Sequence, residues 1–141
     1  MRERFAGATA AALAVVLAGC GGGAPSQAQI ASTASIAVNQ AESRTAQVSC
    51  SQLEWVRTID IGTKFSGATV VVDQHADLPT TRSVRIRNVG SFTGMYSQGG
   101  DSVATTHFSN DTYTIAGTAN GSNSEKPNEP MTATFKITVR C

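Results

Sequence analysis

Apolar and polar residues alternate along most of the chain after residue 50, as in strands that bury one face. The last segment is the clearest: Met131, Phe135, Ile137 and Val139 share one parity, and threonines and basic residues share the other. The alternation predicts strands over residues 53–61, 68–73, 83–87, 92–96, 102–108, 112–117 and 131–141, with Arg57 as a local exception. No stretch after Cys50 has a helical period. The pattern predicts an all-β fold, a small antiparallel sandwich or barrel-like domain of about seven strands.

The first 19 residues have the features of an export signal. Arg2 and Arg4 precede an apolar or small-residue segment over residues 5–19, which is shorter than the roughly 20 residues of a membrane-spanning helix. The sequence Leu17-Ala18-Gly19-Cys20 resembles the bacterial lipobox, in which the cysteine thiol receives a diacylglycerol. We therefore predict a lipoprotein signal peptide at residues 1–19 and lipidation of Cys20. An ordinary signal peptide with an incidental cysteine is the alternative.

Residues 20–49 read as the acylated cysteine followed by a flexible tether. The segment begins with three glycines and continues with Ala, Ser, Thr and Gln, a composition typical of linkers. Ile30, Ile36 and Val38 have few apolar partners nearby, so we expect no packed element here. The hydroxyls of such a spacer are candidate O-glycosylation sites, and plain solubilising polarity is the alternative. They belong to Ser26, Ser32, Thr33, Ser35, Ser43 and Thr45.

Bulk charge names no partner and gives no electrostatic reason to expect nucleic acid. The chain has 11 Lys+Arg and 10 Asp+Glu, and removal of residues 1–19 leaves nine of each, so the mature chain is formally neutral. Two or more acyl chains on one cysteine hold a protein on a bilayer without a transmembrane helix. We expect a lipid-anchored protein on the exported face of the cell membrane or envelope.

Two cysteines lie at the ends of the predicted β domain, residues 50–141. Cys50 is expected to start the first strand and Cys141 to end the last. In an oxidising exported compartment such a pair is most simply a disulfide. A metal site or a free catalytic thiol are the alternatives, but the chain has no CxxC motif and neither cysteine has a histidine nearby in sequence.

Other candidate sites are weaker. The loop from Asp73 through His75 to Asp77 could offer ligands to a divalent ion, but a polar hairpin loop is the favoured interpretation. His107 has no nucleophile motif beside it. Arg85 and Arg87 share the polar side of one strand, where they could meet an anionic head group or simply face solvent. We predict no catalytic, cofactor or metal site.

Several of these segments together resemble the mycobacterial 19-kilodalton lipoprotein antigen family. They are the lipobox, the Ser/Thr/Ala-rich tether, Val48-Ser49-Cys50, the run from Tyr113 to Ala119, the turn around Pro127 to Met131 and the closing Phe135 to Cys141. The resemblance implies a surface or cell-envelope lipoprotein, acylated at Cys20, often glycosylated in the spacer, that engages host innate receptors through its lipid. It implies no enzymatic activity.

The sequence leaves three classes of function. A lipid-anchored envelope protein with a non-catalytic β domain for interaction or structure is the leading hypothesis. A carrier of a small apolar or lipidic ligand would need a dry cavity between sheets, which the few large side chains could hardly line. A hydrolase is disfavoured, because no motif orders a nucleophile, a base and an oxyanion hole.

Overall fold

The computed structural model describes residues 32–141, which form ten strands and, within that range, no helix. The strands are β1 (Ala34–Val38), β2 (Ala41–Thr45), β3 (Val48–Leu53), β4 (Val56–Gly62), β5 (Gly67–Asp73), β6 (Thr80–Val89), β7 (Phe92–Ser97), β8 (Ala104–Ser109), β9 (Thr112–Asn123) and β10 (Lys126–Arg140). Every paired neighbour is antiparallel. The predicted all-β, antiparallel class is confirmed.

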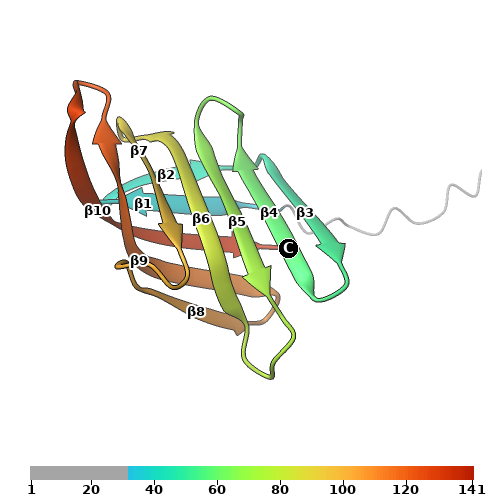
Figure 1. The fold of residues 1–141 in the computed structure, drawn as a ribbon. Helices are drawn as coiled ribbons and strands as arrows, with labels where there is room; N and C mark the ends of the chain where they lie inside the picture. The colour runs from blue at the N-terminus through green and yellow to red at the C-terminus, as the bar shows by residue number, and fades with distance from the viewer. Residues whose placement is uncertain (1–31) are drawn as a thin grey trace, which may run out of the picture.

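The strands belong to one sheet that curls into a nearly closed, barrel-like shape (Figure 1). Their order is β2-β1-β10-β9-β7-β6-β5-β4-β3. The long strand β9 has two partners along its free edge, since β8 pairs with residues 112–117 and β7 with residues 120–123. The edge strands β2 and β3 are consecutive in the chain, so a gap in the ladder lies between two neighbouring segments.

The structure has ten strands where about seven were predicted. The predicted segments correspond to β4 through β10, and β1, β2 and β3 were missed. Residues 53–61 were expected as one strand, but a turn at Glu54 and Trp55 divides them between β3 and β4. Glu54 has a φ of 52°, in the left-handed region used by tight turns. Leu53 and Trp55 lie at the tip of this hairpin and are therefore exposed, despite sharing a parity with buried Ile59.

The expectation of an unpacked tether up to residue 49 is wrong for residues 34–49. Strands β1 and β2 form a hairpin there, and β3 begins at Val48. In the register of β1 with β10, Ile36 lies opposite Ile137 and Val38 opposite Phe135, and all four side chains are buried. The apolar partners that Ile36 and Val38 lack locally come from the far end of the sequence.

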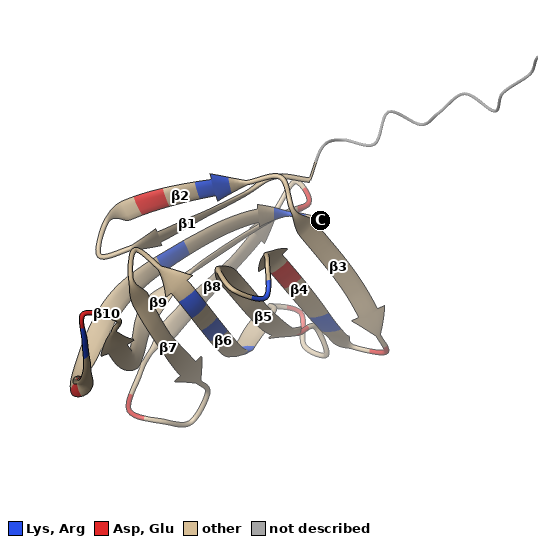
Figure 2. Ribbon diagram, turned by 90° about the horizontal axis from the view of Figure 1, so that it is seen from above, with Lys and Arg blue, Asp and Glu red and all other residues tan. Residues whose placement is uncertain are grey.

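The inside of the curled sheet is filled by side chains. Twenty buried hydrophobic residues from seven strands form one cluster, with Tyr113 and Phe92 as its largest fully buried members. Thr81 is the one buried polar residue among those described, and its hydroxyl is 2.6 Å from that of Thr106. Charged positions are spread over several strands and turns of the described residues (Figure 2).

Two glycines of β9 let neighbouring backbone approach this strand closely. A Cβ atom at Gly117 would overlap the carbonyl oxygen of Val103, and one at Gly121 would overlap that of Thr93. The segments leading into β8 and within β7 therefore approach the β9 backbone directly.

Residues 32–141 contain no helix long and apolar enough to cross a membrane.

Candidate functional site

The predicted disulfide joins Cys50 and Cys141 and is confirmed. Its Cα atoms are 6.0 Å apart, and the two residues are 91 positions apart in sequence. Cys50 lies within the edge strand β3, two residues after its start, and Cys141 directly follows β10. The bond links β3 to the end of β10, two segments that no hydrogen-bonded ladder connects. Both cysteines are therefore structural, which removes the alternatives of a free thiol or a metal ligand.

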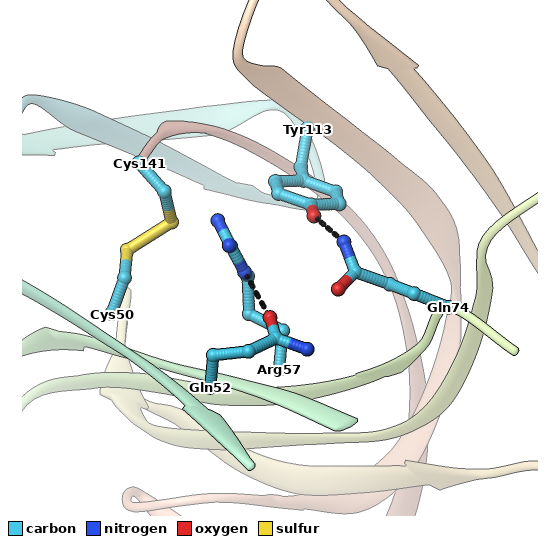
Figure 3. The surroundings of a disulfide bond; sticks show 6 residues. All are labelled: Cys50, Gln52, Arg57, Gln74, Tyr113 and Cys141. Carbon is cyan, nitrogen blue, oxygen red and sulfur yellow. Dashed lines mark hydrogen bonds between the residues drawn. A yellow bond between two sulfur atoms is a disulfide. The ribbon is translucent and has the colours of Figure 1, made fainter. Parts of the chain in front are cut away.

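Beside the disulfide, the side chain of Arg57 enters the open end of the sheet (Figure 3). Its Nε–H donates to Oε1 of Gln52 at 2.9 Å, and the guanidinium carbon lies 6.0 Å from the centre of the Tyr113 ring. Such a position allows a cation–π attraction. The sequence pattern left Arg57 as a local exception to the alternation; the structure shows a half-buried arginine on the core side of β4.

Tyr113 connects this arginine to the opposite layer. Its hydroxyl accepts a hydrogen bond from the side-chain amide of Gln74, and its ring lies 4.4 Å from that of Phe108 on β8, centre to centre. Burial raises the pKa of the Tyr113 phenol, and the nearby charge of Arg57 opposes this rise. Gln52, Arg57, Gln74 and Tyr113 form a polar cluster with one cation.

The loop considered for a divalent ion is organised differently. Oδ1 of Asp73 accepts from the backbone N–H of His75 at 2.8 Å, while Oδ2 pairs with Arg82 on the neighbouring strand. The His75 hydrogen bond, followed by that of Arg82, lowers the pKa of Asp73. The His75 ring instead contacts Trp55 edge-on at 5.8 Å. Residues 32–141 contain no group of three His, Cys, Asp or Glu side chains placed to hold a metal ion.

The remaining cation and histidine candidates do not converge on one site. Arg87, on β6, donates to the carbonyl oxygens of Ile61 and Thr63 and so stabilises the turn of the β4–β5 hairpin. Arg85 is exposed on the outer face of β6, and His107 is exposed on β8 opposite Thr114. These positions fit a supporting arginine and two solvated side chains.

The candidate lipidation and glycosylation residues divide between two regions. Cys20, Ser26 and the signal segment lie outside the described residues. Ser32 and Thr33 directly precede β1, whereas Ser35, Ser43 and Thr45 lie on β1 and β2. The last three are thus part of the folded sheet and not of a spacer.

Comparisons with known proteins agree with the sequence and the fold. A family model described as the Mycobacterium 19 kDa lipoprotein antigen matches residues 27–141. A protein named as a lipoprotein in Mycobacterium indicus pranii is 51% identical over the full length of both chains. One from Mycobacterium avium subsp. hominissuis is 45% identical over 100% of this chain and 97% of its own. Lipoprotein LppE of Mycobacterium tuberculosis is 34% identical over 90% of this chain and 91% of its own.

Proposed function

The chain belongs to the mycobacterial 19 kDa lipoprotein antigen family, and from this membership we propose that it is anchored to the cell envelope by lipid on Cys20. Membership makes it a cell-envelope lipoprotein; the proposal adds the attachment residue and the exported face. The lipobox directly after the apolar signal segment carries this proposal. The Cys50–Cys141 disulfide supports it, because such bonds persist in oxidising, exported compartments.

We further propose that the β domain acts by binding and not by catalysis. The side chains that could carry chemistry are engaged elsewhere: Asp73 with Arg82, and His75 with Trp55. The open end near the disulfide presents Arg57 and amides, which suit recognition more than proton transfer. For the alternative, a carrier of an apolar ligand, the filled interior offers no support.

Engagement of host innate receptors is proposed through the acylated N-terminus. The described domain has a modest polar surface. Burial of acyl chains in an apolar pocket, by contrast, contributes about 0.8 kcal/mol of binding free energy per CH₂. For O-glycosylation, Ser26, Ser32 and Thr33 are the candidates we retain, because Ser35, Ser43 and Thr45 belong to strands.

A Cys20→Ser variant tests the anchor. The variant loses the thiol that receives the diacylglycerol, so we expect it to move from the detergent phase into the aqueous phase and to keep its signal segment. Intact mass measured before and after release of the acyl groups gives an independent readout. As a control, Ser26→Ala changes a hydroxyl close to the anchor and should partition like the unaltered protein. Membrane partition of both variants alike would contradict the proposal.

A further inference from the structure

A cavity of about 590 Å³ lies on the outer face of the sheet, where the described chain enters the fold. Its lining includes two guanidinium groups, from Arg44 and Arg140, and the hydroxyls of Thr33, Ser35, Thr112 and Thr138. In Figure 2 the basic segments on β2 and at the end of β10 lie on the same side as the start of β1.

The strand register explains why these side chains gather. Ser35 lies between Arg44 and Thr138 in one cross-strand row, and Arg140 lies opposite Thr112 in the next. Residues two apart on a strand point to the same face, so both rows project outward together. The backbone N–H of Arg140 donates to the carbonyl of Thr33 at 3.4 Å, which fixes the entering chain beside the second row.

Of the two cations in the cavity lining, Arg44 is paired with Glu42, whereas Arg140 is in no ion pair within residues 32–141. Arg44 pairs with Glu42 at 2.6 Å, but the side chains are 82% and 47% exposed, and such surface pairs contribute little. Among residues 32–141 the other ion pairs are Arg82–Asp73 and Lys126–Glu129, so Arg140 has no carboxylate partner there. Residues 20–31 contain no Asp or Glu. The preceding segment therefore cannot neutralise the two guanidinium groups, and the cavity favours an external anion.

Guanidinium groups beside hydroxyls are suited to phosphate oxygens, because arginine donates in a planar fork that matches them. The cavity exceeds the volume of a phosphate alone and leaves room for a substituent on it. The bilayer is the nearest source of such groups if Cys20 carries the anchor. Thirteen peptide steps separate Cys20 from Thr33, and a fully extended chain of that length spans at most about 45 Å.

We propose that this outer-face cavity binds the phosphate group of anionic lipid headgroups through Arg44 and Arg140, and so holds the β domain against the membrane. The membrane source rests on the proposed anchoring at Cys20. The phosphate recognition itself rests on the cavity alone.

The side-chain Nε–H signals of arginine in NMR spectra test this inference directly. The mature chain has six arginines, and the Arg44→Gln and Arg140→Gln variants assign the two relevant signals. The acylated chain is placed in phosphatidylcholine nanodiscs and titrated with short-chain phosphatidylglycerol, and in a second arm with inorganic phosphate. We expect both signals to shift with phosphatidylglycerol, and each variant to weaken binding about tenfold, as loss of a charge-assisted hydrogen bond does.

Arg85→Gln is the matched control, because it removes the same charge from the outer face of β6, away from the cavity. It should change the affinity less than twofold; an equal loss would show nonspecific attraction and overturn the site. A response to inorganic phosphate alone would overturn the lipid source, and no response in either arm would overturn the proposal. Detergent-phase partition of the same sample reports separately on anchoring, so failure of the anchor is distinguishable from failure of the cavity.

Discussion

At the scale of single residues, Arg57 shows how a charge is accommodated on the core side of a small sheet. Its parity places it with Ile59, so the backbone turns the side chain inward. A buried charge without partners is costly. Here the cost is limited because Gln52 accepts one N–H, the Tyr113 ring lies under the guanidinium, and the open end keeps the group half in contact with solvent.

The same contact makes the phenol of Tyr113 a measurable reporter. Because burial raises its pKa above the usual 10.0, we expect it to ionise at higher pH than a free tyrosine. A group whose pKa is raised on folding stabilises the fold fully below its unfolded pKa. That contribution is lost as pH rises through the folded pKa. Alkaline titration of tyrosinate absorbance measures the shift.

Tyr113→Phe provides the control for this titration, since the chain has only two tyrosines and the difference between the two curves isolates residue 113. The variant also loses the hydrogen bond from Gln74 and should be destabilised by about 1 kcal/mol in denaturant unfolding. A difference curve centred at or below 10 would contradict the burial of this hydroxyl.

At the scale of elements, strands with strict alternation and no long-range requirement could be predicted from the sequence. The closing strand β10 is one: its buried residues Ala133, Phe135, Ile137 and Val139 follow the period of two without interruption. The hairpin β1–β2 could not be predicted, because its burial depends on pairing with residues about 100 positions later. Short apolar runs in an Ala- and Ser-rich segment carry no local sign of a distant partner.

The candidate sites also differ in whether they depend on contacts between distant parts of the chain. The Cys50–Cys141 bond could be predicted because compartment chemistry and two terminal cysteines suffice to name it. The cavity around Arg44 and Arg140 could not, since its two rows exist only once β2, β1 and β10 are in register. Arg57 was named only as an exception to the alternation, because its contacts with Gln52 and Tyr113 exist only in the folded sheet.

The contribution of β1 to the fold can be measured by one substitution on each face. Ile36 is buried against β10, so Ile36→Ala should lower the free energy of unfolding by about 2–5 kcal/mol. Ser35 lies on the opposite face, and Ser35→Ala should change it by less than about 0.5 kcal/mol. Denaturant unfolding of the two variants makes the comparison. Equally small effects would show that β1 lies outside the cooperative unit.

At the scale of the whole molecule, the disulfide completes what the ladder leaves open. The edge strand β3 has β4 as its only ladder partner among the described strands, and Cys50 ties it to the end of β10. A bond that closes a loop of 91 residues restricts the unfolded chain by about 4–5 kcal/mol in the chain-entropy model.

Removal of that bond should therefore lower stability markedly. We expect Cys141→Ser to cost about 2–5 kcal/mol, measured as a lower melting temperature. Reduction of the unaltered protein should reproduce the loss, because both cysteines are exposed to reductant, and Cys50→Ser should match Cys141→Ser. Unchanged melting after complete reduction would contradict a closing role for this bond.

The two ends of the molecule also differ in what each can offer a receptor. The mature chain is formally neutral, and most large hydrophobic side chains of the β domain are buried in its core, which leaves single exposed ones such as Trp55 and Leu78. The acyl chains proposed on Cys20 would bury far more apolar area, at about 0.8 kcal/mol per CH₂. We expect receptor-reporter cells to respond to the acylated chain and to lose that response, at least tenfold in dose, with the Cys20→Ser chain.

The control for this last experiment is a variant that alters the fold and leaves the lipid in place. Acylated Cys141→Ser keeps Cys20 while weakening the β domain, so its receptor dose-response should match that of the unaltered acylated chain. A response that follows the intact domain, and persists after loss of the lipid, would place recognition on the β surface. In that case the polar cluster around Arg57 and Tyr113, which the disulfide holds between the two layers, becomes the first surface to alter.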